Sequence, residues 1–324
     1  MDDFRFTRQK LENRFSALPD FTSPFFTPML LQARGRVLTF PRRPLIMGIV
    51  NINDDSFCGD GTWDPSAALR MAQQMAADGA DVIDAGAESA RTNRSAISVE
   101  EEVQRFRSFI EAYQAWSEEV ADQAPAFDGA QVWPPLLSLN TWRPEVVAVV
   151  LPLGGDLLND IGALPDDRNA RLCAELGAAL LIMHSMGLPK EKHTHVGYPD
   201  IMAELDRFFT EKLVLCQAAG LPRESVVLDP GIDFAKQKDD NLTIYRELER
   251  LQRFGRPVLL PVSRKTVIGE VLGLPDPLDR DAGTLACVAR GMSGGAQIFR
   301  VHAVKQAAEA VKVLWAVESA GRLA

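Results

Sequence analysis

The chain has 324 residues, of which 46% are hydrophobic and 24% are charged, and its formal net charge is −9. These values are those of an ordinary globular protein with a large core, in one large domain or two medium ones. The acidic balance argues against a broad nucleic-acid-binding surface, although a local basic pocket is compatible with it. No stretch is long and apolar enough to cross a membrane.

Cysteine usage and the N-terminus indicate the compartment. The four cysteines are dispersed and form no CxxC pair: Cys58, Cys173, Cys216 and Cys287. This usage suits reduced thiols better than a disulfide framework or a zinc site. The N-terminal stretch MDDFRFTRQKLENRF is charged and lacks the apolar core of a signal peptide. We therefore expect a cytoplasmic protein.

The first 40 residues precede the first clear strand. Within them and just beyond, the stretch 21–43 has the composition of a hairpin or cap at the base of a barrel. We expect residues 1–40 to form an N-terminal extension that packs on one domain at 41–324.

From residue 45 onward, short apolar runs alternate with amphipathic stretches. The runs predicted as strands are 45–50, 80–85, 134–139, 155–160, 178–184, 225–230, 256–262 and 296–302. The stretches predicted as helices are 64–79, 98–116, 143–154, 166–177, 200–220, 239–255, one that opens near Ser263 or a second near Asp281, and 303–317. About eight such units close a parallel (β/α)8 TIM barrel, whose strands are buried on both faces and read as continuous apolar runs. A doubly wound open sheet is the main alternative, and the absence of GxGxxG after the first strand weakens it.

Polar residues stand at the carboxyl end of every predicted strand, which is the end that carries the chemistry in a barrel. A single Asn there is usually a turn residue, and a single His is usually a packing residue. A set that converges on one mouth is a stronger signal. Its members are Asn51, Asp84 with Glu88, Asn140, Asn159 with Asp160, His184, Asp229, Ser263 to Lys265, and Arg300 with His302.

The stretch VVLDPGIDF carries the sharpest of these signals. Apolar residues lead into Asp229, and Pro230 and Gly231 end the strand abruptly. A carboxylate in this position can accept two parallel hydrogen bonds from the N–H and NH₂ edge of an aminopyrimidinone-like ring. The alternative is that Asp229 only initiates the turn through its side chain.

The stretch PVSRKTVIG runs from a strand into a helix start. Ser263 is expected to be the N-cap, and Arg264 and Lys265 would add positive charge where a helix N-terminus attracts an anion. The alternative is a capped helix with a solvated basic turn. Function is favoured, because basic residues in a first turn oppose the helix dipole.

The stretch IFRVHAVK places Arg300 and His302 on one side of the last strand. A guanidinium beside an imidazole suits a phosphate or pyrophosphate. The alternative is an ion pair of one of them with a neighbouring strand end, either Asp84 or Glu88.

Eight motifs in order over 44–316 make the chain resemble the dihydropteroate synthase family of pterin-binding barrels. MGIVNINDDSF resembles the family's MGILNVTPDSF, DVIDAGAESARTN resembles DIIDVGGESTRPG, and LSLNTWRPEV resembles SVDTxxPEV. DLLNDIGAL, LIMHSMGLP and VVLDPGIDFAKQKDDNL resemble DIINDVxGL, MHMxGxP and DPGIGFGKxxxxNL. SRKTVIG and RVHAV resemble SRKSxIG and RVHDV.

The resemblance implies condensation of p-aminobenzoate with 6-hydroxymethyl-7,8-dihydropterin pyrophosphate, which yields dihydropteroate and pyrophosphate in folate biosynthesis. It implies catalytic roles for Asp229, Lys265, Arg300 and His302. It assigns the pterin to Asn140, Asn159, Met183, Asp229, Phe234 and Lys265, and the pyrophosphate to Asn51, Arg91, Arg300 and His302. It assigns p-aminobenzoate to Ser263, Ala90 and Arg91, and Mg²⁺ to Asn51. It also implies a homodimer.

The chain departs from the family pattern at several of these places. Asn140 stands where the family has Asp, and the first and second loops lack the family's prolines. Asp233 and Ala235 replace two glycines after Asp229. These changes leave two alternatives open: a pterin-binding paralogue without synthase activity, acting as a carrier or regulatory partner, or a pterin-dependent enzyme with a different second substrate. A methyltransferase of the same barrel is disfavoured by the intact SRK and RVH motifs, because methyl transfer has no pyrophosphate to hold.

Overall fold

Eight parallel strands form a single closed sheet. The computed structural model describes residues 28–53, 61–88, 95–187, 189–190 and 196–320. Within these ranges the strand order is β8-β7-β6-β5-β4-β3-β10-β9. The strands are β3 (Leu45–Asn51), β4 (Val82–Gly86), β5 (Leu136–Asn140), β6 (Leu157–Asp160), β7 (Ala179–Met183), β8 (Val226–Asp229), β9 (Leu259–Leu260) and β10 (Ile298–Val301).

The two ends of this order, β8 and β9, meet and close the barrel. Leu228 pairs with Val258 in a parallel bridge, and the Leu228 amide donates to the carbonyl of Pro257 at 2.9 Å. Hydrophobic alternation along the chain could not show this contact. The TIM-barrel prediction is confirmed, and the open-sheet alternative is wrong.

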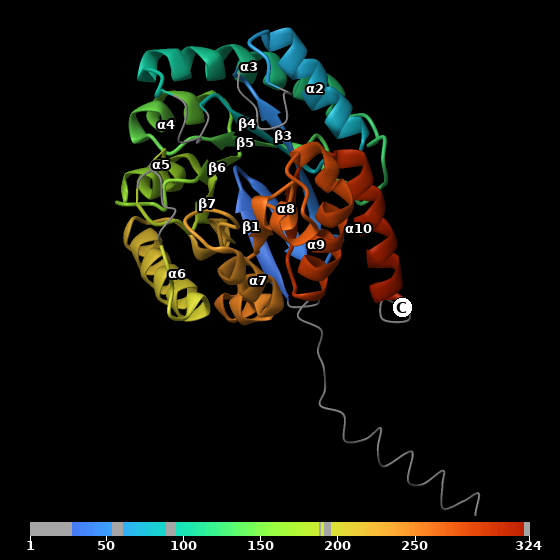
Figure 1. Ribbon diagram of the computed structural model, residues 1–324. Helices are drawn as coiled ribbons and strands as arrows, with labels where there is room; N and C mark the ends of the chain where they lie inside the picture. Colours follow the sequence, from blue (N-terminus) through green and yellow to red (C-terminus); the bar gives the residue numbers. More distant parts are fainter. Residues whose placement is uncertain (1–27, 54–60, 89–94, 188, 191–195, 321–324) are drawn as a thin grey trace, which may run out of the picture.

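Helices surround the strands (Figure 1). They are α2 (Pro65–Ala77), α3 (Val99–Val120), α4 (Pro144–Val150), α5 (Arg168–Leu176), α6 (Ile201–Ala218), α7 (Lys238–Arg246), α8 (Thr266–Leu272), α9 (Asp281–Ser293) and α10 (Val304–Ser319). Short 3₁₀ turns are η2 (Leu151–Leu153), η3 (Arg223–Ser225), η4 (Leu248–Phe254) and η5 (Pro277–Arg280). The sequence predicted a helix near Ser263 or a second one near Asp281, and the structure contains a helix at each place, α8 and α9. None of the helices in the described ranges is long and apolar enough to span a bilayer.

Local chemistry explains where several helices begin and end. Asp200 caps α6, because its Oδ1 accepts from the amides of Met202 at 2.9 Å and Ala203 at 3.0 Å. Asp64 caps α2 in the same way. Gly177 ends α5 in the left-handed conformation, with φ at 67°, which glycine adopts without strain.

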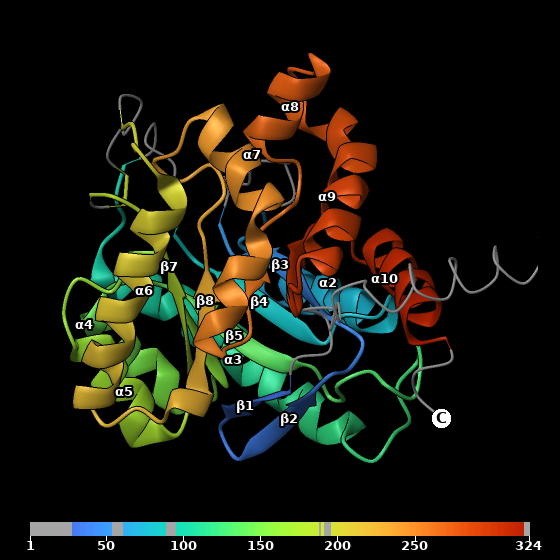
Figure 2. The ribbon, with the colours of Figure 1, turned by 90° about the horizontal axis from the view of Figure 1, so that it is seen from below.

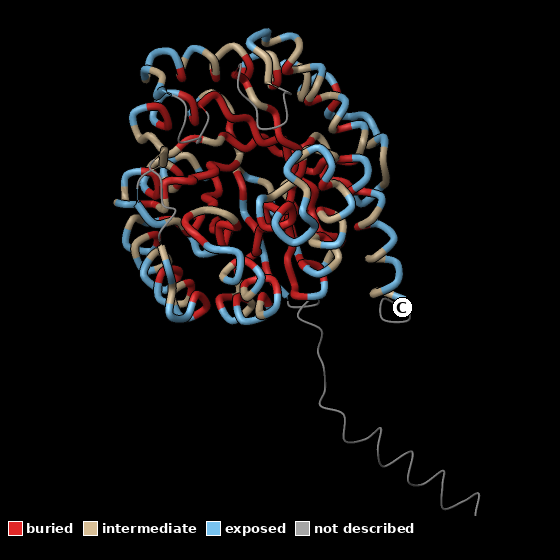
Figure 3. The backbone as a smooth tube through the Cα atoms, viewed as in Figure 1, coloured by how far each residue is buried: buried red, intermediate tan, exposed pale blue. Residues whose placement is uncertain are grey.

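The core has two parts, one on each side of the sheet. Buried residues are concentrated along the strands at the centre of the molecule (Figure 3). Outward-facing strand residues such as Ile46 and Val50 pack against the helices, and inward-facing residues such as Leu45, Met47 and Val227 fill the barrel. All of these residues are at most 1% exposed. Burial on both faces explains why the strands read as continuous apolar runs.

A hairpin closes the base of the barrel, as the sequence predicts. Strands β1 (Met29–Ala33) and β2 (Arg36–Phe40) pair antiparallel, and their alternate residues pack on the inner cluster. Arg34 ties the hairpin to the segment before β6, donating to the carbonyls of Gly155 at 2.8 Å and Leu151 at 2.7 Å. Figure 2 shows β1 and β2 at the end of the barrel opposite α8. The mouth therefore stays open for the strand-end residues.

Candidate active site

The buried carboxylate of Asp84 is the centre of the mouth. It accepts from Arg300 Nε at 2.7 Å, Ser138 Oγ at 2.5 Å, Asn159 Nδ2 at 3.1 Å and Asn140 Nδ2 at 3.2 Å. These donors belong to β5, β6 and β10, so one side chain on β4 links four strand ends. The ion pair of Arg300 with Asp84, one of the alternatives for Arg300, is present.

Asp84 was predicted only as a strand-end residue and as a possible partner of Arg300. The signal for a larger role was its position between Ile83 and Ala85 in a fully buried strand. A carboxylate with no exposed surface needs several donors to compensate for lost hydration. That need indicates a network, but its partners come from distant parts of the chain.

The contacts with Asp84 orient two amide side chains. An ionised carboxylate only accepts hydrogen bonds, so Asn140 and Asn159 must turn their NH₂ groups toward it and their oxygens away. The Oδ1 atom of Asn159 is buried and has no partner among the described residues. A buried amide oxygen without a partner is costly, and such an atom indicates a place for a donor on a ligand.

Asp229 ends β8 as a second buried carboxylate, and it is 3% exposed. Its Oδ1 accepts from the Gly231 amide at 2.7 Å, so the turn that was the alternative interpretation does form. Its Oδ2 accepts no hydrogen bond from the described residues and remains available to a ligand. Burial raises the pKa of Asp229 to about 6, and the Gly231 hydrogen bond and the charge of Lys265 oppose that rise.

Gly231 makes this sharp turn possible. Its φ is +67°, and a Cβ at this position would lie 2.0 Å from the carbonyl oxygen of His184. Only glycine satisfies both the left-handed backbone and the close approach.

Lys265 lies against the loop that follows β8. Its Nζ donates to the Ile232 carbonyl at 2.9 Å and lies 4.9 Å from the centre of the Phe234 ring. Burial lowers the pKa of Lys265, and the charges of Asp233 and Asp229 oppose that fall. Lys265 and Phe234 therefore present a cation and an aromatic surface to the same space.

Ser263 does not cap a helix, so this prediction is wrong. Helix α8 begins at Thr266, and its N-cap position is Lys265, whose side chain makes no cap hydrogen bond. Ser263 Oγ instead lies 2.8 Å from His302 Nδ1 and accepts from the His302 amide at 3.2 Å. The hydroxyl joins the ends of β9 and β10.

Arg264 does not add its charge to that of Lys265, so the prediction of two cations at one anion site is also wrong. Its Nε and Nη2 bind the two carboxylate oxygens of Asp281 at 2.7 and 3.0 Å. Its backbone has φ at +53°, which turns consecutive side chains in different directions.

His184 is a packing residue below the mouth. Its Nδ1 lies 2.8 Å from Lys236 Nζ, and its ring meets Phe208 edge to face at 4.8 Å. Burial lowers the pKa of His184 to about 2 and that of Lys236 to about 7. Glu88 is likewise occupied, by Arg143 at 3.1 Å and Lys190 at 2.7 Å.

Three predicted site residues remain to be placed, and two fall outside the described ranges. Met183 ends β7, is 1% exposed and belongs to the inner cluster, against which Phe234 packs. Ala90 and Arg91 lie outside the described residues. The structure thus brings together Asn140, Asn159, Arg300, Ser263 and His302 in two hydrogen-bonded groups, and Lys265 with Phe234 in a third.

The described residues contain no group of three or more His, Cys, Asp or Glu side chains that could hold a metal ion. Asn51, which ends β3 at the mouth, offers one amide oxygen. A lone oxygen ligand fits Mg²⁺, which keeps several waters and is commonly bound by one or two protein oxygens together with substrate phosphates.

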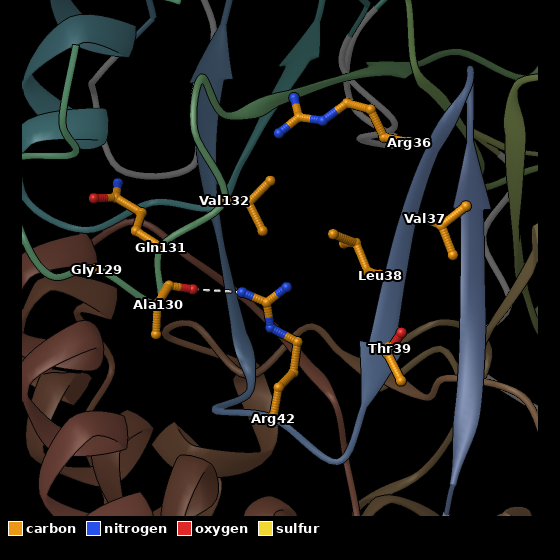
Figure 4. Close-up of a pocket in the computed structure, with 9 residues that line it drawn as sticks. All are labelled: Arg36, Val37, Leu38, Thr39, Arg42, Gly129, Ala130, Gln131 and Val132. Atoms are coloured by element: carbon orange, nitrogen blue, oxygen red, sulfur yellow. Dashed lines mark hydrogen bonds between the residues drawn. The ribbon is translucent and has the colours of Figure 1, made fainter. Parts of the chain in front are cut away.

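A groove of about 510 Å³ lies at the other end of the molecule (Figure 4). It runs between β2 and the segment Gly129, Ala130, Gln131 and Val132. Its arginines already bind backbone carbonyls, Arg36 that of Pro134 at 2.7 Å and Arg42 that of Ala130. The groove therefore carries none of the strand-end chemistry.

The fold and the mouth define a class of protein. The mouth of the closed barrel presents Asn159 Oδ1, a buried acceptor without a partner among the described residues, and Asp229 Oδ2, which accepts no hydrogen bond from them. The cations Lys265 and Arg300 stand at the same mouth. That combination suits a planar ring with an N–H edge and an anionic tail.

Comparison with known proteins gives the particular family. The family "Pterin binding enzyme" matches residues 47–302. The dihydropteroate synthase of Escherichia coli (strain K12) is 36% identical over 293 residues, which cover 90% of this chain and 98% of that protein. The chain belongs to the dihydropteroate synthase family of pterin-binding enzymes.

Solved structures agree with this membership. The dihydropteroate synthase of Xanthomonas albilineans with 4-aminobenzoic acid is 33% identical, with a TM-score of 0.77 over 90% of this chain and 99% of that one. The enzyme of Thermus thermophilus in complex with 6HMPPP is 32% identical, with a TM-score of 0.73 over 89% of this chain and 99% of that one.

Proposed function

We propose that this protein acts as a dihydropteroate synthase, a transferase that joins 6-hydroxymethyl-7,8-dihydropterin pyrophosphate to p-aminobenzoate. The observation that carries the proposal is the presence, at one mouth, of the acceptors Asn159 Oδ1 and Asp229 Oδ2, which have no partner among the described residues, together with the cations Lys265 and Arg300. Relatives bound to 4-aminobenzoic acid and to 6HMPPP support it.

The pterin ring occupies the space between β6, β8 and Lys265. Asp229 accepts from the 2-amino group and the adjacent ring N–H, and Asn159 accepts through Oδ1. Asn140 adds a third acceptor beside Asp84. The contact with Asn159 Oδ1 is favourable because this buried oxygen has no partner among the described residues.

Lys265, Phe234 and Met183 complete the pterin site. Lys265 donates to the acceptor atoms of the ring, and the phenyl ring of Phe234 holds Lys265 in place through the contact at 4.9 Å. Met183 forms the apolar floor.

The pyrophosphate lies toward β10. Arg300 uses Nε for Asp84, which leaves its Nη groups for an anion. His302, Asn51 and Arg91 are the other residues that we assign to the pyrophosphate. Asn51 would hold Mg²⁺ together with the phosphates, and the ion would supply positive charge to the leaving group.

The transfer replaces a C–O bond by a C–N bond. The bond between the exocyclic methylene carbon and pyrophosphate breaks, and its electron pair leaves with the pyrophosphate. The amine nitrogen of p-aminobenzoate supplies the pair for the new bond and loses one proton to the departing pyrophosphate or to water. The chain's task is to fix both partners and to stabilise the separating charges.

The second substrate approaches over Ser263. The hydroxyl of Ser263 is already oriented by His302 at 2.8 Å, so it faces the same side of the mouth as the phosphate residues. Ser263 is the residue we assign to the carboxylate of p-aminobenzoate, together with Ala90 and Arg91, which lie outside the described residues.

A direct product assay tests this proposal. The purified protein is incubated with dihydropterin pyrophosphate, p-aminobenzoate and Mg²⁺, and dihydropteroate is sought by mass spectrometry. Asp229→Ala and Lys265→Ala are the site variants, and Arg264→Ala is the control, because Arg264 is occupied by Asp281. Product that disappears only in the site variants supports the synthase. Pterin binding without product would instead indicate the paralogue or a different second substrate.

Organisation and location complete the proposal. We assign residues 41–324 to one catalytic domain and 1–40 to an extension. A homodimer is proposed from the family resemblance, and exposed Val313 and Val317, one helical turn apart on α10, support it. A cytoplasmic location is supported by unpaired Cys173, Cys216 and Cys287. Sedimentation equilibrium tests the dimer.

A further inference from the structure

Asp233 lies in the loop after β8 in an unusual backbone conformation. Its φ is +68°, which is rare for a residue other than glycine but tolerated by Asp and Asn. The related family pattern DPGIGFGK has glycine at this position. This chain therefore has a carboxylate at position 233, although the backbone conformation there is less favourable for Asp than for Gly.

That carboxylate caps a helix that belongs to another loop. Asp233 Oδ2 accepts from the Thr266 amide, and Oδ1 lies 3.3 Å from the Val267 amide. Both amides belong to the first turn of α8, which has no acidic residue and no side-chain cap of its own. Capping satisfies two amides that the helix leaves unpaired, and the negative charge suits the helix N-terminus.

A second contact fixes Asp233 itself. Its amide donates to Asn241 Oδ1 at 2.9 Å, and Asn241 Nδ2 donates back to Asp233 Oδ1 at 3.2 Å. Asn241 belongs to α7 and is 2% exposed. The carboxylate is thus held from a rigid element before it reaches α8.

Lys265 is the residue immediately before the capped turn. Its side chain is held by the two neighbours of Asp233 in sequence, Ile232 through its carbonyl and Phe234 through its ring. Its backbone is held by Asp233 through the next two amides. Three consecutive residues therefore fix one lysine, and the middle one carries a charge opposite to it.

We propose that Asp233 is a positioning residue that holds the start of α8, and with it Lys265, against the pterin site. The proposal rests on the proposed function only for the role of Lys265 toward the pterin. The position of Lys265 itself can be measured without any reaction.

Two substitutions separate the charge from the backbone. Asp233→Gly removes the cap and relieves the backbone at φ +68°, and Asp233→Asn keeps an acceptor oxygen without the charge. The control is Asp200→Gly, which removes a carboxylate that also accepts from two successive amides at a helix start. Asp200 has no contact with Lys265 among the described residues.

The first readout is acetylation of Lys265 by acetic anhydride in the full-length protein, followed by peptide mass spectrometry. We expect the rate to rise several-fold in Asp233→Gly, because a released amine is more accessible to the reagent. Asp233→Asn should be intermediate, and Asp200→Gly should match the wild type. An unchanged rate in Asp233→Gly would overturn the proposal.

The second readout is steady-state kinetics. We expect Asp233→Gly to lower kcat/KM for the pterin substrate about tenfold, mainly through KM, the size of one lost charge-assisted contact. The KM for p-aminobenzoate should not change. A fall confined to p-aminobenzoate would contradict the proposal. A wild-type protein without product would refute the proposed function, whereas the acetylation rates would still decide on Asp233.

Discussion

The substitution Asp84→Asn tests the network at the mouth most directly. The side chain keeps its size but loses its charge and replaces one acceptor oxygen by an NH₂ group. Asp84 accepts from Arg300, Ser138, Asn140 and Asn159. An NH₂ group in the carboxylate's place must face at least one of these donors, so a contact is lost whichever way the amide turns.

The size of the loss follows from burial. Removing one partner of a fully buried ion pair costs about 3–5 kcal/mol. Arg300 is 22% exposed and Asp84 is 0% exposed, so water compensates in part for the loss on the arginine side. We therefore expect Asp84→Asn to lower the free energy of unfolding by about 2–4 kcal/mol. Release of Arg300 should also lower kcat/KM for the pterin substrate by roughly 100-fold, because small misplacements are costly in catalysis.

A second aspartate near the same strand is the matched control. Asp81 precedes β4, is 0% exposed and pairs with Arg43 at 3.0 Å, at the base of the barrel. Asp81→Asn should destabilise the protein at least as much, because Arg43 is only 3% exposed. It should change kcat/KM by less than about threefold, since it leaves the mouth intact.

Urea denaturation and steady-state kinetics of both variants form the assay. The kinetics are measured without urea, at a temperature at which both variants remain folded. Equal kinetic losses in the two variants would mean that the effect is general destabilisation. Full activity in Asp84→Asn would show that the network does not position Arg300, and the reasoning would be refuted.

Four further predictions follow from three residues of the site. Asp229 must be ionised to accept from the pterin, and its pKa is about 6, so kcat/KM should fall below that pH. In a pH–rate profile, the residual activity of Asp229→Asn should lack this fall at acid pH. The folded-state pKa of Asp229 lies above its usual 3.8, so its ionisation makes folding less favourable as pH rises from about 4 to 6, and urea titrations of Asp229→Asn should lack this slope. Asn140→Asp should raise kcat roughly tenfold at alkaline pH, where a second carboxylate can stabilise a cation-like pterin carbon; an unchanged pH–rate profile would argue against any charge effect at this position. Gly231→Ala should prevent pterin binding measured by calorimetry, because its Cβ would lie 2.0 Å from the His184 carbonyl oxygen.

The sequence predicted the barrel well because a strand that is buried on both faces consists of a continuous run of apolar residues. The strand from Leu136 to Asn140 and the strand from Val226 to Asp229 both lie inside or at the edges of the predicted runs. The hairpin was one of the two forms predicted from the composition of residues 21–43, and its alternating burial in β1 became visible only in the structure. Closure depended on the contact of Leu228 with Val258, which are 30 residues apart and carry no common local pattern.

The candidate site was predicted less completely, because its side chains choose partners across the barrel. Ser263 was expected to cap a helix but bonds to His302, 39 residues further along the chain. Arg264 was expected to face an anion but pairs with Asp281. Hydrogen-bond preference depends on which groups the fold brings near, and residue type alone does not reveal them. For the same reason, the sequence did not predict that Asp84 is the centre of a hydrogen-bond network.

The arrangement around Asp84 also gives a physical meaning to Asn140. The Asn140 Nδ2 atom lies 3.2 Å from Asp84 Oδ2, which also binds Arg300. A carboxylate in place of this amide would face Asp84 at a distance where two negative charges share a proton or move apart. The amide of Asn140 instead donates to Asp84, and the full negative charge of Asp84 remains to pair with Arg300. The chain thus gives up one negative charge near the pterin and obtains a mouth that repels pyrophosphate less, while the Oδ1 atom of Asn140 remains as an acceptor turned away from Asp84.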